Sequence, residues 1–558
     1  MKLKNILYSM MMGTAVLTGT TSCVSDLDQY PHTETTSKDV YTSLANYEAV
    51  LGKIYAAMVT SGQGKGGDNK DMESVLNNGS GFDYMRMFIN MQECGTDEFA
   101  STWLTGEQTT GLTYLSWDAN DAWVSDMYYR IYYNIALCNE FLRNANSASF
   151  SGADAEKMKE YKAEVRFMRA LFYYHALDFY RNIPMVTEND PVGSFIPPRY
   201  TPQQTFDYIE SELKDCVGDM LPASTCPYGQ ASQGAAYTLL AKLYLNSEVY
   251  TGVAKYAECK EACEKVMGMG YSLESDYSKL FNADNDKRTN EIIFALPVSA
   301  EHTVSWGSST YLVCGQVSMS NANQNVADYG VTAGWSEFRL RPEFVNKFTQ
   351  TDIDGSGDKR CKFFTNGQSK DISSMTEETA GYLSEKWSNL KDDKTTASNT
   401  ADAGVETDFP LFRLADVYLM YAECVARTKG ASWDPWPDGK TDASDPEVIA
   451  SRTKGAIYWI NKVRERAYGK GKGQVWSSNF ANDDEFLQFI LDERARELYH
   501  EGYRRTDLIR YGQFTTNKYI WQWKGGTHDG QAVDSKYNIY PIPNTELTAN
   551  PNLHNDNY

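Results

Sequence analysis

The chain has 558 residues, of which 53 are Lys or Arg and 74 are Asp or Glu, giving a net charge of −21 at pH 7. This acidity excludes a nucleic-acid-binding surface built on clustered basic residues, because phosphate contacts supply most of that affinity. A hydrophobic content of 42% excludes a disordered chain. Aromatic residues make up 13% of the chain. Such rings either pack between helices or form a surface that stacks on flat, uncharged ligands.

The first residues have the pattern of an export signal. Two lysines precede an apolar stretch over residues 6–17, and small residues then lead to Cys23. The stretch is too short to span a bilayer, so we expect residues 1–22 to be a cleaved signal peptide. Thr20-Thr21-Ser22 is similar to a bacterial lipobox, which predicts acylation of Cys23 and a lipidated tether over residues 23–35. An ordinary signal peptide with an incidental cysteine is the alternative.

The nine cysteines after Cys23 are scattered and odd in number, which argues against a disulfide framework. Cys259 and Cys263 are four residues apart on a predicted helix, but no second Cys or His pair completes a zinc site. We therefore predict buried free thiols.

Most of the chain has the apolar spacing of amphipathic helices, with apolar residues every three or four positions. The predicted helices cover residues 121–144, 153–180, 235–246, 255–267, 411–428 and 454–467. Thr201-Pro202 adds a helix start, with a capping threonine and a proline at the first helical position. Consecutive helices of this length resemble tetratricopeptide pairs. The predicted fold class is thus mostly α, a right-handed superhelical scaffold in which residues 36–558 form one domain.

Two stretches, residues 62–118 and 285–405, are rich in Gly, Ser, Thr and Asn and have no sustained helical period. Long irregular segments on a helical scaffold are where binding residues are expected. Three tryptophans lie in them, namely Trp103, Trp306 and Trp335. Trp123 instead lies on the apolar stripe of a predicted helix, so we assign it to the core.

Signatures of enzymes are missing from the sequence. No histidine falls in a His-Glu-x-x-His pattern, and there is no Gly-x-Ser-x-Gly motif or phosphate-binding loop. Asp284-Asn285-Asp286 offers oxygens that a calcium ion could use, but Arg288 interrupts them and the rest of a calcium loop is absent. No carboxylate pair can be singled out for glycoside hydrolysis. We therefore predict a protein without a cofactor that is not an enzyme.

Five motifs occur in order along the chain. They are Asp26-Leu27-Asp28-x-x-Pro31, Arg166-x-x-Arg169-Ala170-Leu171, Asp408-x-Pro410-Leu411-x-Arg413, Glu493-Arg494-x-Arg496-Glu497-Leu498 and Tyr540-Pro541-Ile542-Pro543. Together they resemble the SusD/RagB family, and the resemblance extends from Cys23 to Tyr558. It implies a lipid-anchored, surface-exposed outer-membrane protein of Bacteroidota that binds glycans and passes them to a SusC-like TonB-dependent transporter. Residues 309–315 and 512–526 are similar to a starch-binding member in particular, which implies starch or maltooligosaccharides as ligands.

The resemblance also implies site residues. In the starch-binding member an arc of three aromatic rings holds helical starch, and these rings fall on Trp103, Trp306 and Trp335. The second ring is a tyrosine there, so Trp306 keeps the stacking face. An arginine that bonds to sugar hydroxyls matches Arg86. Its aspartate partner falls on Asn78, and an asparagine near the first ring falls on Gly106.

This placement agrees with the chemistry of glucose. Aromatic faces stack on the C–H groups of the sugar ring, and arginine bonds to the hydroxyls at its rim. Three alternatives remain open at this point. The changes at Asn78 and Gly106 are compatible with a different glycan, Arg86 could form an ion pair rather than a ligand contact, and a surface glycosidase is the less favoured function.

Overall fold

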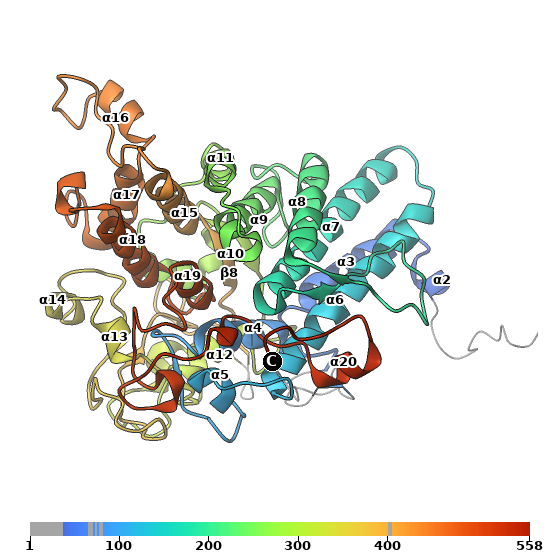
Figure 1. Ribbon diagram of the computed structural model, residues 1–558, viewed down its shortest axis with the longest axis horizontal. Coiled ribbons are helices and arrows are strands. Elements are labelled where there is room, and N and C mark those ends of the chain that lie inside the picture. The colour runs from blue at the N-terminus through green and yellow to red at the C-terminus, as the bar shows by residue number, and fades with distance from the viewer. Residues whose placement is uncertain (1–36, 65–70, 73–74, 77–81, 400–403) are drawn as a thin grey trace, which may run out of the picture. The chain divides into compact units, whose positions relative to one another are not determined.

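The computed structural model describes residues 37–64, 71–72, 75–76, 82–399 and 404–558 (Figure 1). The predicted leader, Cys23, the tether and Asn78 lie outside the described residues. The chain divides into two compact units, Met1–Val50 and Leu51–Tyr558. The described part of the first unit holds α2 (Ser37–Val40) and the start of α3 (Leu44–Ala56). No helix in the described ranges combines the length and apolarity that a bilayer span needs.

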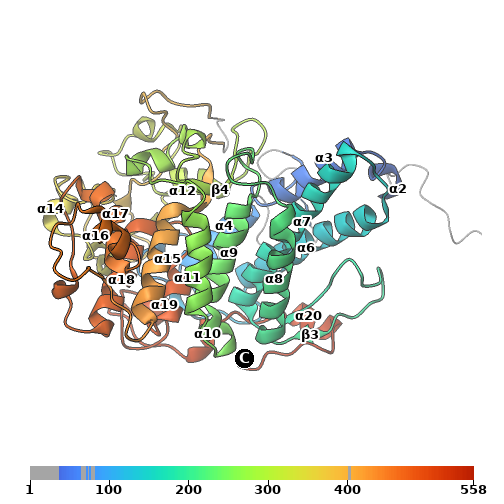
Figure 2. The same cartoon turned by 90° about the horizontal axis from the view of Figure 1, so that it is seen from above.

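The second unit is built on helices that pack against their neighbours in chain order. Helix α6 packs on α7, α7 on α8, α9 on α11, α11 on α15, and α15 on α17 and α18. Figure 2 shows α7, α8, α9, α11 and α15 side by side. Their bounds are α6 (Ala122–Ser147), α7 (Ala153–Tyr180), α8 (Pro202–Cys216), α9 (Gln233–Leu245), α11 (Tyr256–Met267), α15 (Leu414–Arg427), α17 (Ala456–Tyr468) and α18 (Asp483–Leu498). The predicted mostly α fold with successive helix pairs is confirmed.

The helix ends follow from local sequence. Asp121 caps α6 by accepting hydrogen bonds from the backbone N–H groups of Trp123 and Val124. Thr201 and Gln204 form the predicted capping box of α8. The short helix α10 (Ser247–Thr251) ends at Gly252, whose φ of +76° suits glycine.

Buried ion pairs tie the later helices together. Arg413 is paired with Glu291, Glu497 and Glu501 at 3.1, 2.5 and 2.7 Å, and all four side chains are fully buried. The motif around Glu493 is therefore structural. Arg504, which follows it, pairs with Asp97 at 2.6 Å.

Short antiparallel strand pairs connect the loops to this scaffold. They are β1 (Ala100–Ser101) with β5 (Phe338–Arg339), β2 (Ile183–Pro184) with β3 (Arg199–Tyr200), β4 (Ile292–Leu296) with β8 (Phe409–Arg413), and β6 (Phe363–Phe364) with β7 (Leu383–Ser384). Because residues 409–413 form β8, the helix predicted over 411–428 begins only at Leu414.

The two stretches predicted to be irregular contain helices. The first includes α4 (Tyr84–Glu93), and the second includes α12 (Ser308–Gly315). Every residue of α4 and of α12 is buried, so neither has the polar face on which a periodic pattern depends. The other short helices are α5 (Thr110–Tyr114), α13 (Pro342–Val345), α14 (Gln350–Ile353), α16 (Pro446–Arg452), α19 (Arg504–Arg510) and α20 (Asn544–Ala549).

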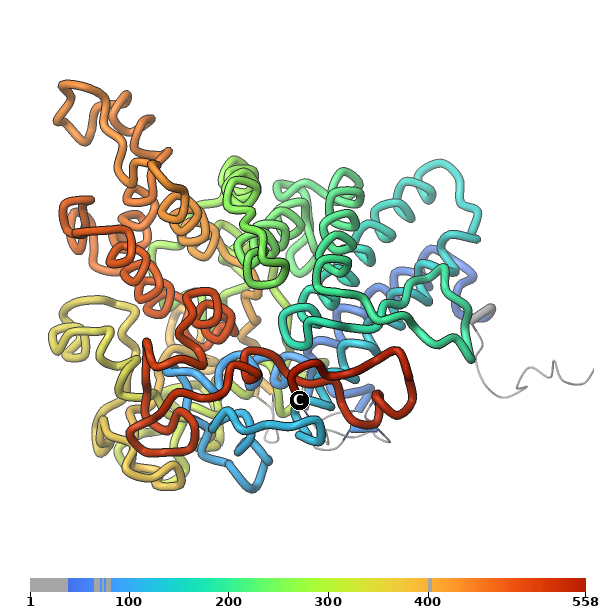
Figure 3. The backbone as a smooth tube through the Cα atoms, in the orientation of Figure 1, coloured from blue at the N-terminus to red at the C-terminus, as the bar shows by residue number. Residues whose placement is uncertain are grey.

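The C-terminal segment runs back to the region between α5 and α6 (Figure 3). The backbone N–H of Asn544 donates to the carbonyl of Ala119 at 3.1 Å. The indole N–H of Trp117 donates to the Tyr558 hydroxyl at 2.7 Å. These bonds fix the last residues of the chain beside the loop between α5 and α6.

Candidate glycan-binding site

Trp103 and Trp335 lie at the same end of one small antiparallel ladder. Trp103 follows β1 and Trp335 precedes β5, and the two strands pair with Ala100 opposite Arg339. The indole Nε1 of Trp103 donates to the backbone carbonyl of Trp335 at 3.0 Å. Two rings that are 232 residues apart in sequence are thereby brought together.

Trp306 is placed through Asp83. The Asp83 carboxylate accepts hydrogen bonds from the Ser305 hydroxyl at 2.6 Å and from the backbone N–H of Ser308 at 3.1 Å. A Cβ on Gly307 would lie only 2.2 Å from Asp83 Oδ1, so this close approach needs glycine. Since Asp83 also caps α4, the Trp306 segment is fixed to the start of that helix.

Helix α12 connects the second and third rings. It begins two residues after Trp306, and at its far end the carbonyl of Cys314 accepts a hydrogen bond from the backbone N–H of Trp335 at 2.9 Å. An α-helix rises 1.5 Å per residue, so the two tryptophan segments are separated by about 12 Å along α12.

Trp103 and Trp306 are, with Trp476, the exposed tryptophans of the described residues. Trp103 is 40% exposed, Trp306 is 38% exposed and Trp335 is half-buried. Trp123 is buried, as predicted, and stacks on Phe82 with ring centroids 5.3 Å apart. All three candidate rings also lie outside helices and strands, as predicted. Exposed indoles held on ordered backbone are the property expected of a stacking surface.

Each tryptophan has a residue nearby in strained backbone. Gln108, Ser308 and Ser336 have φ values of +57°, +47° and +52°. Left-handed backbone is costly for residues other than glycine and recurs at binding sites, where the surrounding contacts enforce it. The sequence contains no signal for these three positions.

The Arg86 side chain bonds to all three segments that carry the tryptophans. Its side chain is 2% exposed, and its guanidinium carbon lies 4.0 Å from the Phe82 ring centroid and 4.2 Å from that of Tyr311. Nη1 donates to the carbonyl of Trp306 at 2.7 Å, and Nη2 donates to Glu337 at 3.3 Å and to Glu107. The family resemblance implies that Arg86 bonds to sugar hydroxyls, with an ion pair as the alternative, and in the structure these donors are bonded to protein groups.

Glu107 and Glu337 are site residues that sequence reasoning missed. Glu107 is four residues after Trp103, and Glu337 is two residues after Trp335. Their closeness to the tryptophans was a usable signal, but only the fold shows that they share Arg86 as a partner.

Gly106 supports the face of the first ring. A Cβ at this position would lie 3.2 Å from Cε3 of Trp103. At the other edge, Met319 is 62% exposed, and its backbone N–H donates to the hydroxyl of Ser336 at 2.7 Å. The backbone of Met319 is thus fixed to the residue that follows Trp335.

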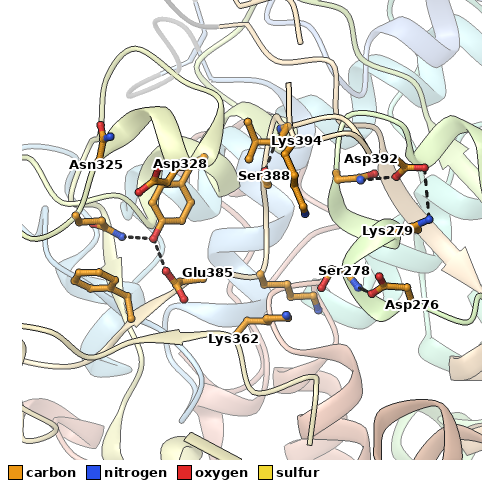
Figure 4. Close-up of a pocket in the computed structure, with 16 residues that line it drawn as sticks. Asp276, Ser278, Lys279, Asn325, Asp328, Lys362, Glu385, Ser388, Asp392 and Lys394 are labelled. Atoms are coloured by element: carbon orange, nitrogen blue, oxygen red, sulfur yellow. Dashed lines mark hydrogen bonds and ion pairs between the residues drawn. The ribbon is translucent and has the colours of Figure 1, made fainter. Parts of the chain in front are cut away.

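A separate cavity of about 350 Å³ lies between η3 (Tyr277–Phe281), η5 (Val326–Tyr329) and the segment after β7. Figure 4 shows Lys362 and Lys394 pointing into it. The Glu385 carboxylate accepts a hydrogen bond from the Tyr329 hydroxyl at 2.6 Å, and Asp392 accepts one from Asn282 at 2.9 Å. None of the three candidate tryptophans lines this cavity.

The carboxylate considered for calcium is engaged within the protein. Asp284 accepts hydrogen bonds from Lys287 at 2.7 Å and from the backbone N–H of Asp392 at 2.9 Å. Across the described residues, no three His, Cys, Asp or Glu side chains converge as metal ligands would.

Comparison with known proteins identifies the family. The model described as "SusD family" matches residues 352–558, and the model described as "Starch-binding associating with outer membrane" matches residues 27–245. The starch-binding protein SusD of Bacteroides thetaiotaomicron is 32% identical over 99% of this chain and 99% of its own. This chain belongs to the SusD family.

Further SusD-family proteins share the fold. The SusD-like protein P25 of Formosa agariphila is 26% identical over 78% of each chain. A SusD superfamily structure from Parabacteroides distasonis covers 94% of this chain and 100% of its own, with a TM-score of 0.66 and 21% identity. Surface glycan-binding protein A of Bacteroides thetaiotaomicron, solved with laminarihexaose, covers 92% of this chain and 99% of its own, with a TM-score of 0.65 and 16% identity. Members of the SusD family bind carbohydrate, and the second matching model associates the family with the outer membrane.

Proposed function

We propose that this SusD-family protein captures starch or maltooligosaccharides at the cell surface without cleaving them and passes them to a SusC-like TonB-dependent transporter. The observation that carries the proposal is the exposure of Trp103 and Trp306 on segments that are hydrogen-bonded to each other through Trp335 and α12. Three rings spaced along a surface match a polymer of neutral glucose units with apolar C–H faces better than a single small ligand. The identity of 32% with a starch-binding protein supports starch as the polymer.

The binding chemistry is stacking on the apolar faces of the sugars. The indole N–H of Trp103 is already bonded to Trp335, which leaves its ring face for the ligand. Stacking on a neutral sugar does not depend on the net charge of the protein, so an acidic protein can bind a neutral polymer at this site. We assign Arg86 to holding the rings in place rather than to direct contact with sugar hydroxyls, because its side chain is 2% exposed.

The carboxylates nearest the rings support binding rather than hydrolysis. Glu107 and Glu337 are both bonded to Arg86, and Glu337 is buried. A glycosidase needs two carboxyl groups that flank the scissile bond in the substrate site. A pair engaged with a buried arginine does not fit this requirement.

The proposed anchor is a lipid on Cys23. Residues 1–22 would be the leader, residues 23–35 the tether and residues 36–558 the glycan-binding domain. The family's association with the outer membrane supports this arrangement. Labelling cells with a fatty acid that carries an alkyne tests it, since the wild type should be labelled and Cys23→Ala should not. Equal labelling of both proteins would contradict the assignment.

Native affinity electrophoresis tests the glycan. Gels that contain starch, inulin, pectin or laminarin are compared with a gel without polysaccharide, and retardation in starch alone is the expected result. Retardation in another polysaccharide and not in starch identifies a different glycan and contradicts the choice of starch. Release of reducing sugar from starch over several hours would contradict the proposal that the protein does not cleave its ligand.

A further inference from the structure

The three tryptophan segments meet at one buried ion cluster formed by Arg86, Glu107 and Glu337. Arg86 reaches Glu107 and Glu337 with the same nitrogen, Nη2, and the contact with Glu337 is 3.3 Å. Its other terminal nitrogen donates to the carbonyl of Trp306 at 2.7 Å. One guanidinium therefore contacts all three segments that carry the candidate rings.

Both carboxylates are rigidly attached to the rings through the backbone. The N–H of Glu107 donates to the carbonyl of Trp103 at 3.1 Å, and the Glu107 carbonyl accepts from the indole of the buried Trp123 at 2.8 Å. The N–H of Glu337 donates to the carbonyl of Gly315 at 2.8 Å, at the end of α12. A change in the spacing of the two carboxyl groups must therefore move the backbone next to the rings.

The cluster holds two carboxyl groups against one guanidinium. Burial raises the pKa of Glu337 to about 8, and although Arg86 lowers this pKa, Glu107 raises it and is hydrogen-bonded to Glu337. Glu337 thus holds a proton near neutral pH. Within the described residues, the other titratable groups that face the cluster are Tyr311 and Cys94, and burial raises the pKa of both, so they stay neutral.

We propose that Arg86, which is bonded to Glu107, to Glu337 and to the carbonyl of Trp306, sets the spacing of the three tryptophans, and that loss of the proton on Glu337 weakens glycan binding. The proposal rests on the proposed function for its ligand. Removal of the proton leaves two carboxylates on one guanidinium, of which Glu337 is buried, and their repulsion pushes the Trp103 and Trp335 segments apart. The affinity of the site for glycan is then sensitive to pH.

The sign of the pH effect follows from the shift. An acid whose pKa is raised on folding holds its proton more tightly in the folded chain. The stabilisation that protonated Glu337 gives to the folded cluster is complete below the ordinary glutamate pKa of 4.5. It is lost as pH rises through about 8. We therefore expect constant affinity at acidic pH and a decline above about pH 8.

Titration calorimetry with maltoheptaose from pH 5 to pH 9.5 at fixed ionic strength tests the proposal. For the wild type we expect the Kd to rise by about tenfold above the midpoint, because one proton changes an equilibrium by at most tenfold per pH unit. Glu337→Gln keeps the shape and a hydrogen bond but cannot ionise, so its Kd should not change between pH 5 and pH 9.5. Glu301→Gln, at an exposed carboxylate, is the matched control and should keep the wild-type pH profile. A wild-type Kd that is constant to pH 9.5, or a Glu337→Gln profile that equals the wild-type one, would overturn the proposal.

A measurement without glycan separates this proposal from the proposed function. In protein labelled with 5-fluorotryptophan, the fluorine resonances of Trp103, Trp306 and Trp335 are assigned by Trp→Phe variants and followed by NMR against pH. Shifts with a midpoint near 8 that disappear in Glu337→Gln support the cluster, even if the wild type fails to bind starch. Resonances that do not move up to pH 9.5 overturn it, even if starch binds.

Arg86 is tested with Arg86→Lys, which keeps the charge but contacts one segment instead of three. We expect weaker binding, seen as a higher Kd at 20 °C, in protein whose far-UV spectrum and urea midpoint equal those of the wild type. A Kd equal to the wild type in such folded protein means that Arg86 does not position the rings and overturns this part of the proposal. If Arg86→Lys does not fold, the Glu337→Gln measurements decide alone.

Discussion

The indole N–H of Trp103 donates to the backbone carbonyl of Trp335 at 3.0 Å. This bond uses the polar edge of the first ring and leaves its face exposed to solvent. It also ties a side chain after β1 to the backbone before β5, so the first and third rings cannot move independently. The stacking surface is thus preorganised before any ligand arrives, which reduces the entropy lost on binding.

Two variants of Trp103 distinguish the contribution of its ring face to glycan affinity from that of its indole N–H. Trp103→Phe keeps a stacking face but loses the hydrogen bond to Trp335, whereas Trp103→Ala loses both. We expect the Kd for maltoheptaose to be a few-fold higher in Trp103→Phe and more than about tenfold higher in Trp103→Ala. A tenfold change corresponds to about 1.4 kcal/mol of binding free energy. Titration calorimetry measures both. Equal losses for the two variants would mean that the hydrogen bond, and not the ring face, determines affinity.

Gly106 is expected to control the tilt of the first ring. In Gly106→Ala the new Cβ would lie 3.2 Å from Cε3 of Trp103, so the ring must shift by a few tenths of an ångström. Because the ring is 40% exposed, it can move without disturbing the core, and we expect weaker glycan binding at unchanged thermal stability. The control is Gly218→Ala, where the added Cβ has no neighbour within 4 Å. Wild-type affinity in Gly106→Ala would contradict this role.

The scaffold was predictable because its helices are amphipathic. The predicted range 153–180 coincides with α7, and the Thr201-Pro202 start coincides with the capping box of α8. Helices α4 and α12, which hold the site, were missed because all of their residues are buried. A periodic apolar pattern arises in a helix with one buried face and one solvent-exposed face. Helices α4 and α12 have no exposed face.

The site was predictable only in part. Trp103, Trp306 and Trp335 were separated from core residues such as Trp123 by their irregular surroundings and by family resemblance. Their mutual placement depends on bonds between distant positions, such as Ser308 with Asp83, that are 225 residues apart. The burial of Arg86 also depends on such contacts, so the sequence left both an ion pair and a sugar contact open for this residue.

The buried ion pairs of the scaffold are expected to determine stability. In Arg413→Met, the carboxylates Glu291, Glu497 and Glu501 lose a shared buried partner. We expect the free energy of unfolding to fall by about 3–5 kcal/mol, because unpaired buried charges are costly. Urea denaturation measures the change. Lys429→Ala, at an exposed lysine that follows α15, is the control and should leave the midpoint unchanged. An unchanged midpoint in Arg413→Met would contradict the structural role.

Acid should destabilise the protein through the same carboxylates. Burial would raise the pKa of Glu497, but Arg466, Arg413 and Arg360 outweigh it and lower the pKa to about 2. A lowered pKa contributes stability above the ordinary value of 4.5, and this stability is lost as pH falls toward 2. Urea midpoints measured from pH 7 to pH 2.5 should therefore drop steeply below about pH 4.5, and the slope should be smaller in Glu497→Gln. Equal slopes in both proteins would show that other groups control acid unfolding.

The thiols are expected to be inert in the folded protein. The described cysteines are all free, and only Cys226 and Cys361 are not fully buried. Burial raises the pKa of Cys226 to about 12, so little reactive thiolate is present at pH 8. A soluble form without Cys23 should react slowly with Ellman's reagent, first at these two positions, and completely in concentrated guanidinium. Fast reaction of several thiols in the native state would contradict the predicted burial.

The three-ring surface is tested most directly by titration calorimetry of maltoheptaose with wild type and with the triple variant Trp103→Ala, Trp306→Ala, Trp335→Ala. Lys362→Ala, in the separate cavity, is the matched control. The account predicts binding by the wild type and by the control, no detectable binding by the triple variant, and equal far-UV spectra for all three proteins. Binding by a folded triple variant with wild-type affinity would contradict it.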